Sequence, residues 1–380
     1  MKSRVLPFFT LLAAVAACVF FFLSFRESPS VGNADADSQR TDGANAAHSA
    51  DASGKNSATG KPSAAGKMAP VNWDFFKAMD GGSGIPEATP EDIARFLAKH
   101  GETAANLVAA FESTHDRRWL DRALELFPGS PIVLMKAIDF IPATSPLKDG
   151  EAYQVNKARL DLIGRFKAAD PKNPVPWIFA AQEFFKAKQA GEGIAEIRAA
   201  LERPAFYTYS NERMDAAQRL YESLGLGTLE AGALAMFGLT LPHMTAATQS
   251  SRGLMEWQKS AAESGDTAAA DEALRLTYAL GRTFATPEAS RMLIGQLVGI
   301  SMEKRALEAL PADAQRDWLA VTPAQRLAEI EKQKQAVKDV TAASEWVLRS
   351  RDEQIFAEWL RRVRSDGESA ALSWVRAQKK

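Results

Sequence analysis

Apolar residues recur every three or four positions along most of the chain after residue 70. Ile93, Phe96 and Leu97 follow this spacing, and the same pattern returns in Ala104–Phe111, Leu120–Phe127, Trp177–Phe184 and Phe356–Val363. A helix with this spacing buries one face against a neighbour. No segment shows a convincing alternation of apolar and polar residues, which a half-buried strand would require. The pattern therefore predicts an all-α fold.

Short breaks separate these helices, among them Asp170-Pro171 and Gly191-Glu192-Gly193. Helices joined by short connections usually pack as antiparallel neighbours, so we expect stacked antiparallel helix pairs. The glycines of Gly295-Gln296-Leu297-Val298-Gly299 fall one helical turn apart. We expect them to allow close packing against the helix that begins after Asp266, because a glycine presents no side chain to a neighbouring backbone.

Capping residues predict several helix boundaries. Thr89-Pro90-Glu91-Asp92 combines a hydroxyl N-cap, a proline at the first helical position and acids in the first turn. Gly101 is expected to end that helix. The other predicted helices are Leu229–Leu241, one from Pro242 to about Ser264, one capped by Asp266, one from Thr286-Pro287-Glu288 to about Leu310, and a long polar helix over Thr322–Ser350.

The N-terminal apolar run Val5–Phe25 contains no charged residue and follows Lys2 and Arg4. A helix of this length spans a hydrocarbon core of about 30 Å. The cationic flank is the side expected to remain cytoplasmic. Residues 1–26 are therefore predicted to be a signal-anchor and transmembrane helix. Residues 27–70, rich in Ala, Ser and Gly, are predicted to be a disordered linker because they offer too little apolar surface to bury.

Two alternatives to an uncleaved anchor remain. Ala34-Asp35-Ala36 offers small residues for a cleaved secretory signal, although it lies well past the apolar run. Val15-Ala16-Ala17-Cys18 resembles a bacterial lipobox, which would place a lipid on Cys18, although the apolar run continues beyond this cysteine. The anchor and both alternatives imply that the bulk of the chain is exported. We predict a single-pass protein of a bacterial inner membrane with its C-terminal body in the periplasm.

The segment Pro174–Leu201 resembles a tetratricopeptide repeat. Trp177 stands at the first aromatic position of that motif, Ala180-Ala181 at its small pair, Phe184 at its next aromatic position and Ala195 at the alanine of its second helix. Similar patterns occur in Leu254–Thr277 and, more weakly, in Leu107–Pro128. The resemblance implies a TPR-like α-solenoid with a concave face that binds peptides or proteins. We predict a TPR-like region over residues 71–225 and a region of longer helices with C-terminal capping helices over 226–380.

Candidate chemistry is sparse. The single cysteine lies in the apolar run, and the four histidines lack the spacing of metal ligands. The sequence therefore predicts no metal, no cofactor and no catalytic residue. The net charge of −1 does not favour nucleic acid as a partner. The basic and aromatic segment Trp359–Arg364 is interpreted either as an interfacial helix or as part of a capping helix with one solvated face.

The sequence as a whole predicts a non-catalytic, membrane-anchored scaffold that binds a protein or peptide partner. Trp119, Tyr207 and Tyr209 are the candidate partner-binding residues, because aromatic side chains often anchor such interfaces. One alternative is a cell-envelope hydrolase whose site is assembled from distant carboxylates, which would show two acids converging in a deep pocket. Another is a structural envelope protein that self-associates. The partner, its pathway and the oligomeric state remain open.

Overall fold

The computed structural model describes residue 73 and residues 86–141, 155–203, 205–285 and 291–378. These residues form helices and contain no strand, which confirms the predicted all-α class. Both the predicted anchor and the predicted linker lie outside them. Among the residues described, no helix is both long and apolar enough to cross a membrane.

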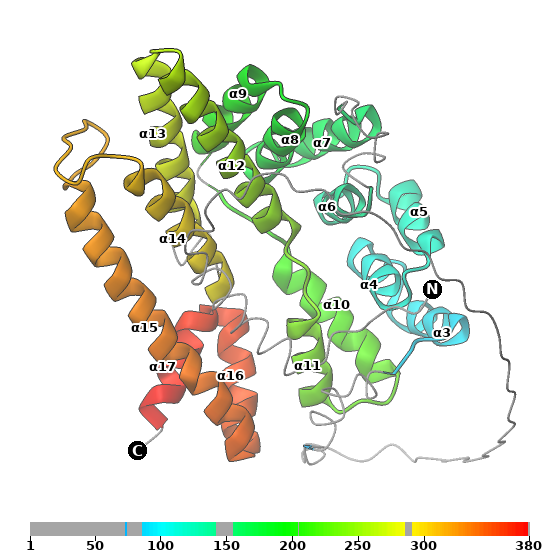
Figure 1. The fold of residues 1–380 in the computed structure, drawn as a ribbon. Coiled ribbons are helices and arrows are strands. Elements are labelled where there is room, and N and C mark those ends of the chain that lie inside the picture. Colours follow the sequence, from blue (N-terminus) through cyan, green and yellow to red (C-terminus); the bar gives the residue numbers. More distant parts are fainter. Residues whose placement is uncertain (1–72, 74–85, 142–154, 204, 286–290, 379–380) are drawn as a thin grey trace, which may run out of the picture.

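The helices follow one another through the chain and are drawn in Figure 1. Their bounds are α3 Pro90–His100, α4 Ala104–Thr114, α5 Arg117–Leu126, α6 Pro131–Phe140, α7 Lys157–Ala169, α8 Val175–Lys186, α9 Ala190–Leu201, α10 Ser210–Ser223, α11 Thr228–Phe237, α12 Pro242–Glu263, α13 Thr267–Phe284, α14 Leu293–Glu308, α15 Pro323–Ser350, α16 Glu353–Asp366 and α17 Glu368–Gln378.

Local capping determines four of these boundaries as predicted. Thr89 and Asp92 form a reciprocal capping box at the start of α3, and Gly101, at φ +82°, ends the helix. The side chain of Asp266 accepts a hydrogen bond from Ala269 N at the start of α13. Thr322 forms a second capping box, with Gln325, at the start of α15. In each case the sequence supplies both the donor and the acceptor within one turn.

The predicted helix over Leu229–Leu241 is wrong at its C-terminal end. Helix α11 ends at Phe237, and the amide of Gly238 caps it by donating to the carbonyl of Leu234. Two residues further on, Thr240 accepts hydrogen bonds from Arg213 through its carbonyl, at 2.9 Å, and through its hydroxyl, at 2.9 Å. A buried guanidinium of α10 thus engages the backbone that would otherwise extend the helix.

The predicted helix start at Thr286-Pro287-Glu288 lies outside the described residues. Among those described, α14 begins at Leu293, after the non-helical Arg291 and Met292. The amide of Leu293 donates to the carboxylate of Glu368 at 2.8 Å. Nearby, the guanidinium of Arg291 donates to the carbonyls of Arg364, at 2.6 Å, and Ser365, at 3.0 Å. The start of α14 is therefore capped from the α16–α17 corner, far away in the sequence, and local capping residues could not reveal it.

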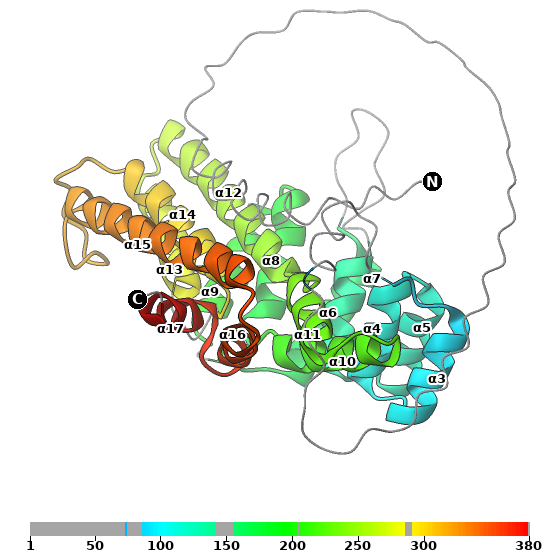
Figure 2. The same cartoon turned by 90° about the horizontal axis from the view of Figure 1, so that it is seen from below.

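Consecutive helices pack together in several places, including α4 with α5, α8 with α9, and α12 with α13 and α14. Other contacts join distant parts of the chain: α10 lies against α4, α12 against α8, and α11 against α16. Figures 1 and 2 show α10 beside α3 and α4, with α11 packed on α10, while α15 extends along α14 toward α16 and α17. The contact between α11 and α16 brings the middle of the chain against its C-terminal part.

Three large apolar clusters form the core. The first extends from Phe111 in α4 to Met302 in α14, and the second from Met214 in α10 to Val375 in α17. The third joins α3–α6 to α10, from Ile93 to Leu220. Because the first two clusters both take residues from either side of position 225, the N-terminal and C-terminal regions share core. The boundary after residue 225 stays a prediction.

The pair of helices that resembles a tetratricopeptide repeat is formed by α8 and α9. Trp177, Ala180 and Ala181 are buried, as the resemblance implies, whereas Ala195 is exposed. The close approach is made instead by Gly193, where a Cβ atom would lie 3.0 Å from the ring of Phe185. The segment predicted as a break, residues 191–193, is therefore the first turn of α9, packed on α8.

Charged side chains buried between helices are paired. Glu303 of α14, which is fully buried, accepts two hydrogen bonds from Arg326 of α15 at 3.0 and 2.6 Å. In the same way, Arg159 of α7 lies 2.8 Å from the buried carboxylate of Glu183 in α8. Since an unpaired buried charge is costly, these pairs constrain how the helices dock.

Candidate functional site

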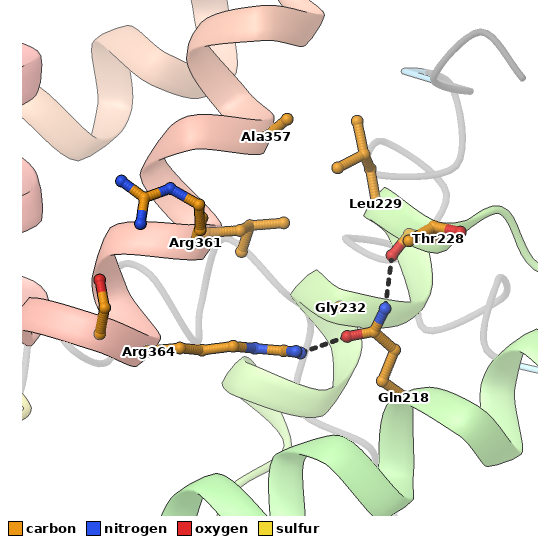
Figure 3. A pocket seen from close by; sticks show the side chains of 9 residues that line it. Gln218, Thr228, Leu229, Gly232, Ala357, Arg361 and Arg364 are labelled. Carbon is orange, nitrogen blue, oxygen red and sulfur yellow. Dashed lines mark hydrogen bonds between the residues drawn. The ribbon is translucent and has the colours of Figure 1, made fainter. Parts of the chain in front are cut away.

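A groove lies between α11 and α16, with a volume of about 430 Å³. Figure 3 shows it from close by, with Leu229 and Ala357 projecting toward each other from the two helices. Its lining is largely apolar at the floor and polar at the edges: Gln218, Thr228, Leu229, Gly232, Ala357, Leu360, Arg361, Arg364 and Ser365. The groove is open to solvent and presents no pair of acids.

The sequence of α16 explains why this helix both packs in the core and lines the groove. Phe356, Trp359 and Val363 form the stripe that is buried in the second cluster. Trp359, only 1 % exposed, is therefore a core residue rather than an interfacial one. The adjacent stripe, with Ala357 and Arg364 two turns apart, faces the groove. The segment predicted as either an interfacial or a capping helix is thus packed in the core on one side and lines a groove on the other.

The opposite wall is α11, whose residues from Leu229 to Met236 are all buried. Gly232 lies in the middle of this helix and lines the groove. A Cβ atom there would meet the Gln218 amide oxygen at 3.4 Å, Leu360 at 3.6 Å and Arg364 at 3.7 Å. These are ordinary contact distances, so a Cβ atom fits at this position, and a longer side chain would extend into the groove that Gly232 lines.

Arg364 crosses one end of the groove. Its guanidinium donates to the amide oxygen of Gln218 and lies 3.1 Å from Asp215, both in α10 (Figure 3). The side chain of Arg364 is 28 % exposed, so it is held in place but still reached by solvent. Gln218 in turn donates to the carbonyl of Thr228 at 3.4 Å. The result is an apolar floor that ends at a fixed cation.

Arg361 lies at the edge, with its guanidinium turned away from the groove in Figure 3. It donates two hydrogen bonds to Glu358, each 2.7 Å long. Hydrogen bonds from Arg361, and then from Arg362, lower the pKa of Glu358 to about 2. The charge of Arg361 is therefore balanced on its own helix, whereas Arg364 carries its charge across the groove.

A second, smaller pocket of about 50 Å³ surrounds Glu112 in α4. The carboxylate of Glu112 lies 3.2 Å from Lys136 Nζ and accepts a hydrogen bond from Arg213. Burial, and next the charge of Glu112, raises the pKa of Tyr221, which also lines this pocket. Glu112 is the single carboxylate in the lining, so the two converging acids that the hydrolase alternative requires are not found in this described pocket.

The three aromatic residues predicted to bind a partner occupy different environments. Tyr207 is 47 % exposed and donates to the carboxylate of Glu212, which raises the pKa of Tyr207 to about 12. Tyr209 is half-buried and donates to Asp170, and its ring lies 4.7 Å from that of Tyr207 in an edge-to-face arrangement. Trp119, in α5, and Tyr209 each pack against both the first and the third cluster. The structure thus brings the two tyrosines together and leaves them on the α9–α10 connection, not in the groove.

His243 and His115 have structural surroundings. His243 is buried and packs against the rings of Phe206 and Phe284, which also contact each other, and burial lowers the pKa of His243 to about 3. His115 is the C-cap of α4 in a left-handed conformation, and Asp116 is the N-cap of α5. Within the described ranges, no group of three or more His, Cys, Asp or Glu side chains is placed to hold a metal ion.

Sequence reasoning did not find the groove. Gly232 within an apolar helix, and two arginines three positions apart in α16, were the available signals, but only the contact between α11 and α16 joins them. No family model, curated protein or solved structure matches the chain. The functional argument therefore depends on the geometry of the groove itself.

Proposed function

We propose that this protein is a non-catalytic helical scaffold that binds a protein or peptide partner in the groove between α11 and α16. The supporting observation is the form of the groove: an apolar floor, open to solvent, that ends at the guanidinium of Arg364. Grooves between helices commonly receive peptide segments that bury apolar anchors. The resemblance to tetratricopeptide repeats supports a stacked-helix scaffold of the same general kind.

The scaffold is proposed to face the periplasm, tethered to a bacterial inner membrane by Val5–Phe25. The length and apolarity of that run, and the cationic Lys2 and Arg4 before it, support this placement. Residues 27–70 would then act as a spacer between the bilayer and the helical body. Trp119, Tyr207 and Tyr209 stay predicted partner-binding residues, of which Tyr207 is the most exposed.

Site-specific photo-crosslinking of the full-length chain in cells tests this function. A photoreactive amino acid is placed at Thr228, an exposed residue that lines the groove, and in a separate variant at Gly164 in α7, which is also exposed and has open space around it. We expect an adduct of defined mass from Thr228 that is absent from Gly164 and is lost when Gly232→Leu fills the groove. Identical adducts from both positions, or an adduct that persists in Gly232→Leu, would refute the proposal.

A further inference from the structure

The shape of the groove suits the binding of one additional helix. Its α16 wall presents Ala357, Leu360 and Arg364, spaced by about one helical turn, and its α11 wall presents Leu229 and Gly232 at the same interval. Two facing stripes with helical spacing make a trough that a third helix can fill by the packing rules that govern the rest of the fold. Ala357 and Gly232 are small, which allows the incoming helix to approach closely.

The charge of the lining is of one sign. Arg364 supplies that charge, because the guanidinium of Arg361 turns away from the groove (Figure 3), and no carboxylate belongs to the lining. Asp215 and Glu358, which pair with these arginines, lie outside the lining. Because the guanidinium of Arg364 stands at the end of the apolar floor, a segment whose apolar side chain occupies the floor can also bring a carboxylate to Arg364. The groove therefore favours an acid placed about one helical turn from an apolar residue.

We propose that the occupant of the groove is an amphipathic helix of a partner protein, in which Asp or Glu follows or precedes a large apolar residue by three or four positions. This inference rests on the proposed function and specifies the partner's chemistry. The apolar residue packs on Leu229 and Leu360, and the carboxylate pairs with Arg364. Since Arg364 is partly exposed and already contacts Asp215, the new pair contributes mainly to selectivity between partners rather than to affinity.

Selection from a random peptide library tests the proposal. The probe is a phage-displayed library of peptides about 12 residues long, or about three helical turns. It is selected on the full-length chain in detergent after depletion against the Gly232→Leu variant. Because leucine has a higher helix propensity than glycine, Gly232→Leu is expected to keep α11 folded, which circular dichroism verifies. We expect the enriched peptides to carry an acid three or four positions from Leu, Ile or Phe.

Charge-altered variants separate the role of Arg364 from nonspecific binding of peptides to the apolar floor. Selection on Arg364→Glu should enrich Lys or Arg at the position of the acid, and Arg364→Gln should remove the preference for charge. Arg361→Gln is the matched control, because its guanidinium turns away from the groove, and it should leave the acidic preference unchanged. For the wild-type chain we expect the acidic peptides to bind about two- to fivefold more tightly than the same peptides with Gln in place of the acid.

The outcomes distinguish this inference from the function on which it rests. Peptides that depend on Gly232 but show no acidic preference, or the same preference in Arg364→Glu, would overturn the proposed partner chemistry and leave the scaffold function standing. Failure to enrich any peptide that depends on Gly232 would also overturn this inference. The scaffold function itself fails only if the crosslink from Thr228 is absent or independent of the groove.

Discussion

A Cβ atom on Gly299 would lie only 2.6 Å from the carbonyl oxygen of Gly281. In the reverse direction, a Cβ atom on Gly281 would lie 2.8 Å from the carbonyl oxygen of Gly299. Helices α13 and α14 therefore approach so closely that neither position accepts a side chain. The close packing predicted for the Gly295–Gly299 motif is confirmed at Gly299, whose contact on α13 is a second glycine.

We predict that Gly299→Ala destabilises the protein by about 1–3 kcal/mol, because the added methyl group meets rigid backbone and the two helices must separate. Urea unfolding of the full-length chain in detergent, followed by circular dichroism, measures the change. Gly164→Ala in α7 is the matched control. Its Cβ atom meets open space, so the higher helix propensity of alanine should stabilise the protein by about 0.5–1 kcal/mol. Equal effects at the two positions would contradict the close approach.

Removal of one partner from the buried Glu303–Arg326 pair should be more costly than removal of both. Arg326→Met leaves the carboxylate of Glu303 buried, with Arg282 no closer than 4.0 Å, and we expect a loss of about 3–5 kcal/mol. Burial already raises the pKa of Glu303, which means that the buried carboxylate depends on the positive charge of Arg326 to stay ionised. The double variant Glu303→Leu with Arg326→Met should recover much of this loss. A double variant less stable than Arg326→Met would show that the pair is not coupled in this way.

His243 predicts a dependence of stability on pH. Its pKa is about 3 in the folded protein against 6.5 in an unfolded chain, chiefly because the ring is buried. As the pH falls below about 6.5, the unfolded chain takes up a proton that the folded protein does not, so stability is lost between about pH 6.5 and pH 3. At about pH 4.5 this loss amounts to about 2–3 kcal/mol.

The variant His243→Phe removes the titrating group and keeps an aromatic ring packed against Phe206 and Phe284. Its stability relative to the wild type should therefore increase by about 2–3 kcal/mol when the pH is lowered from about 7.5 to about 4.5. Urea unfolding of both proteins at the two pH values measures this difference. The same difference at both values would mean that His243 takes up its proton in the folded state as readily as in the unfolded one.

The N-terminal run gives a prediction about the intact protein. If Val5–Phe25 is an uncleaved anchor, the chain purified from membranes should retain Met1, resist extraction with alkaline carbonate and be unaffected by Cys18→Ser. Mass spectrometry of the purified chain decides among the alternatives. A chain that begins shortly after Ala36 would indicate a cleaved signal, and a chain that begins at a lipid-modified Cys18 would indicate a lipoprotein.

Much of the fold could be predicted because many helix signals are local. Thr89 with Asp92, and Thr322 with Gln325, cap their own helices, so the sequence alone locates these boundaries. The start of α14 could not be found in this way, because Glu368 caps it from another helix. At the end of α11, Gly238 caps the helix locally, and Arg213 of α10 binds the carbonyl of Thr240 in the backbone that follows. Errors occur where a tertiary contact replaces the local signal.

The candidate site was beyond sequence reasoning for the same reason. An aromatic residue in a loop is an attractive partner anchor, yet Tyr209 is half-buried and bonded to Asp170. The groove instead combines Gly232, in a helix that looks wholly buried, with Arg364, in a helix that looks like an ordinary cap. Neither residue indicates a binding groove from the sequence alone, because the groove forms only where α11 packs against α16.

The most direct measurement of the central claim is the affinity of the partner captured from Thr228 for three forms of the full-length chain: the wild type, Gly232→Leu and Gly164→Leu. The account predicts that Gly232→Leu weakens binding by about tenfold or more, because leucine occupies the trough between α11 and α16. Gly164→Leu should stay within about twofold of the wild type, because it lies on an exposed face of α7. Equal affinities for the wild type and Gly232→Leu would contradict the account.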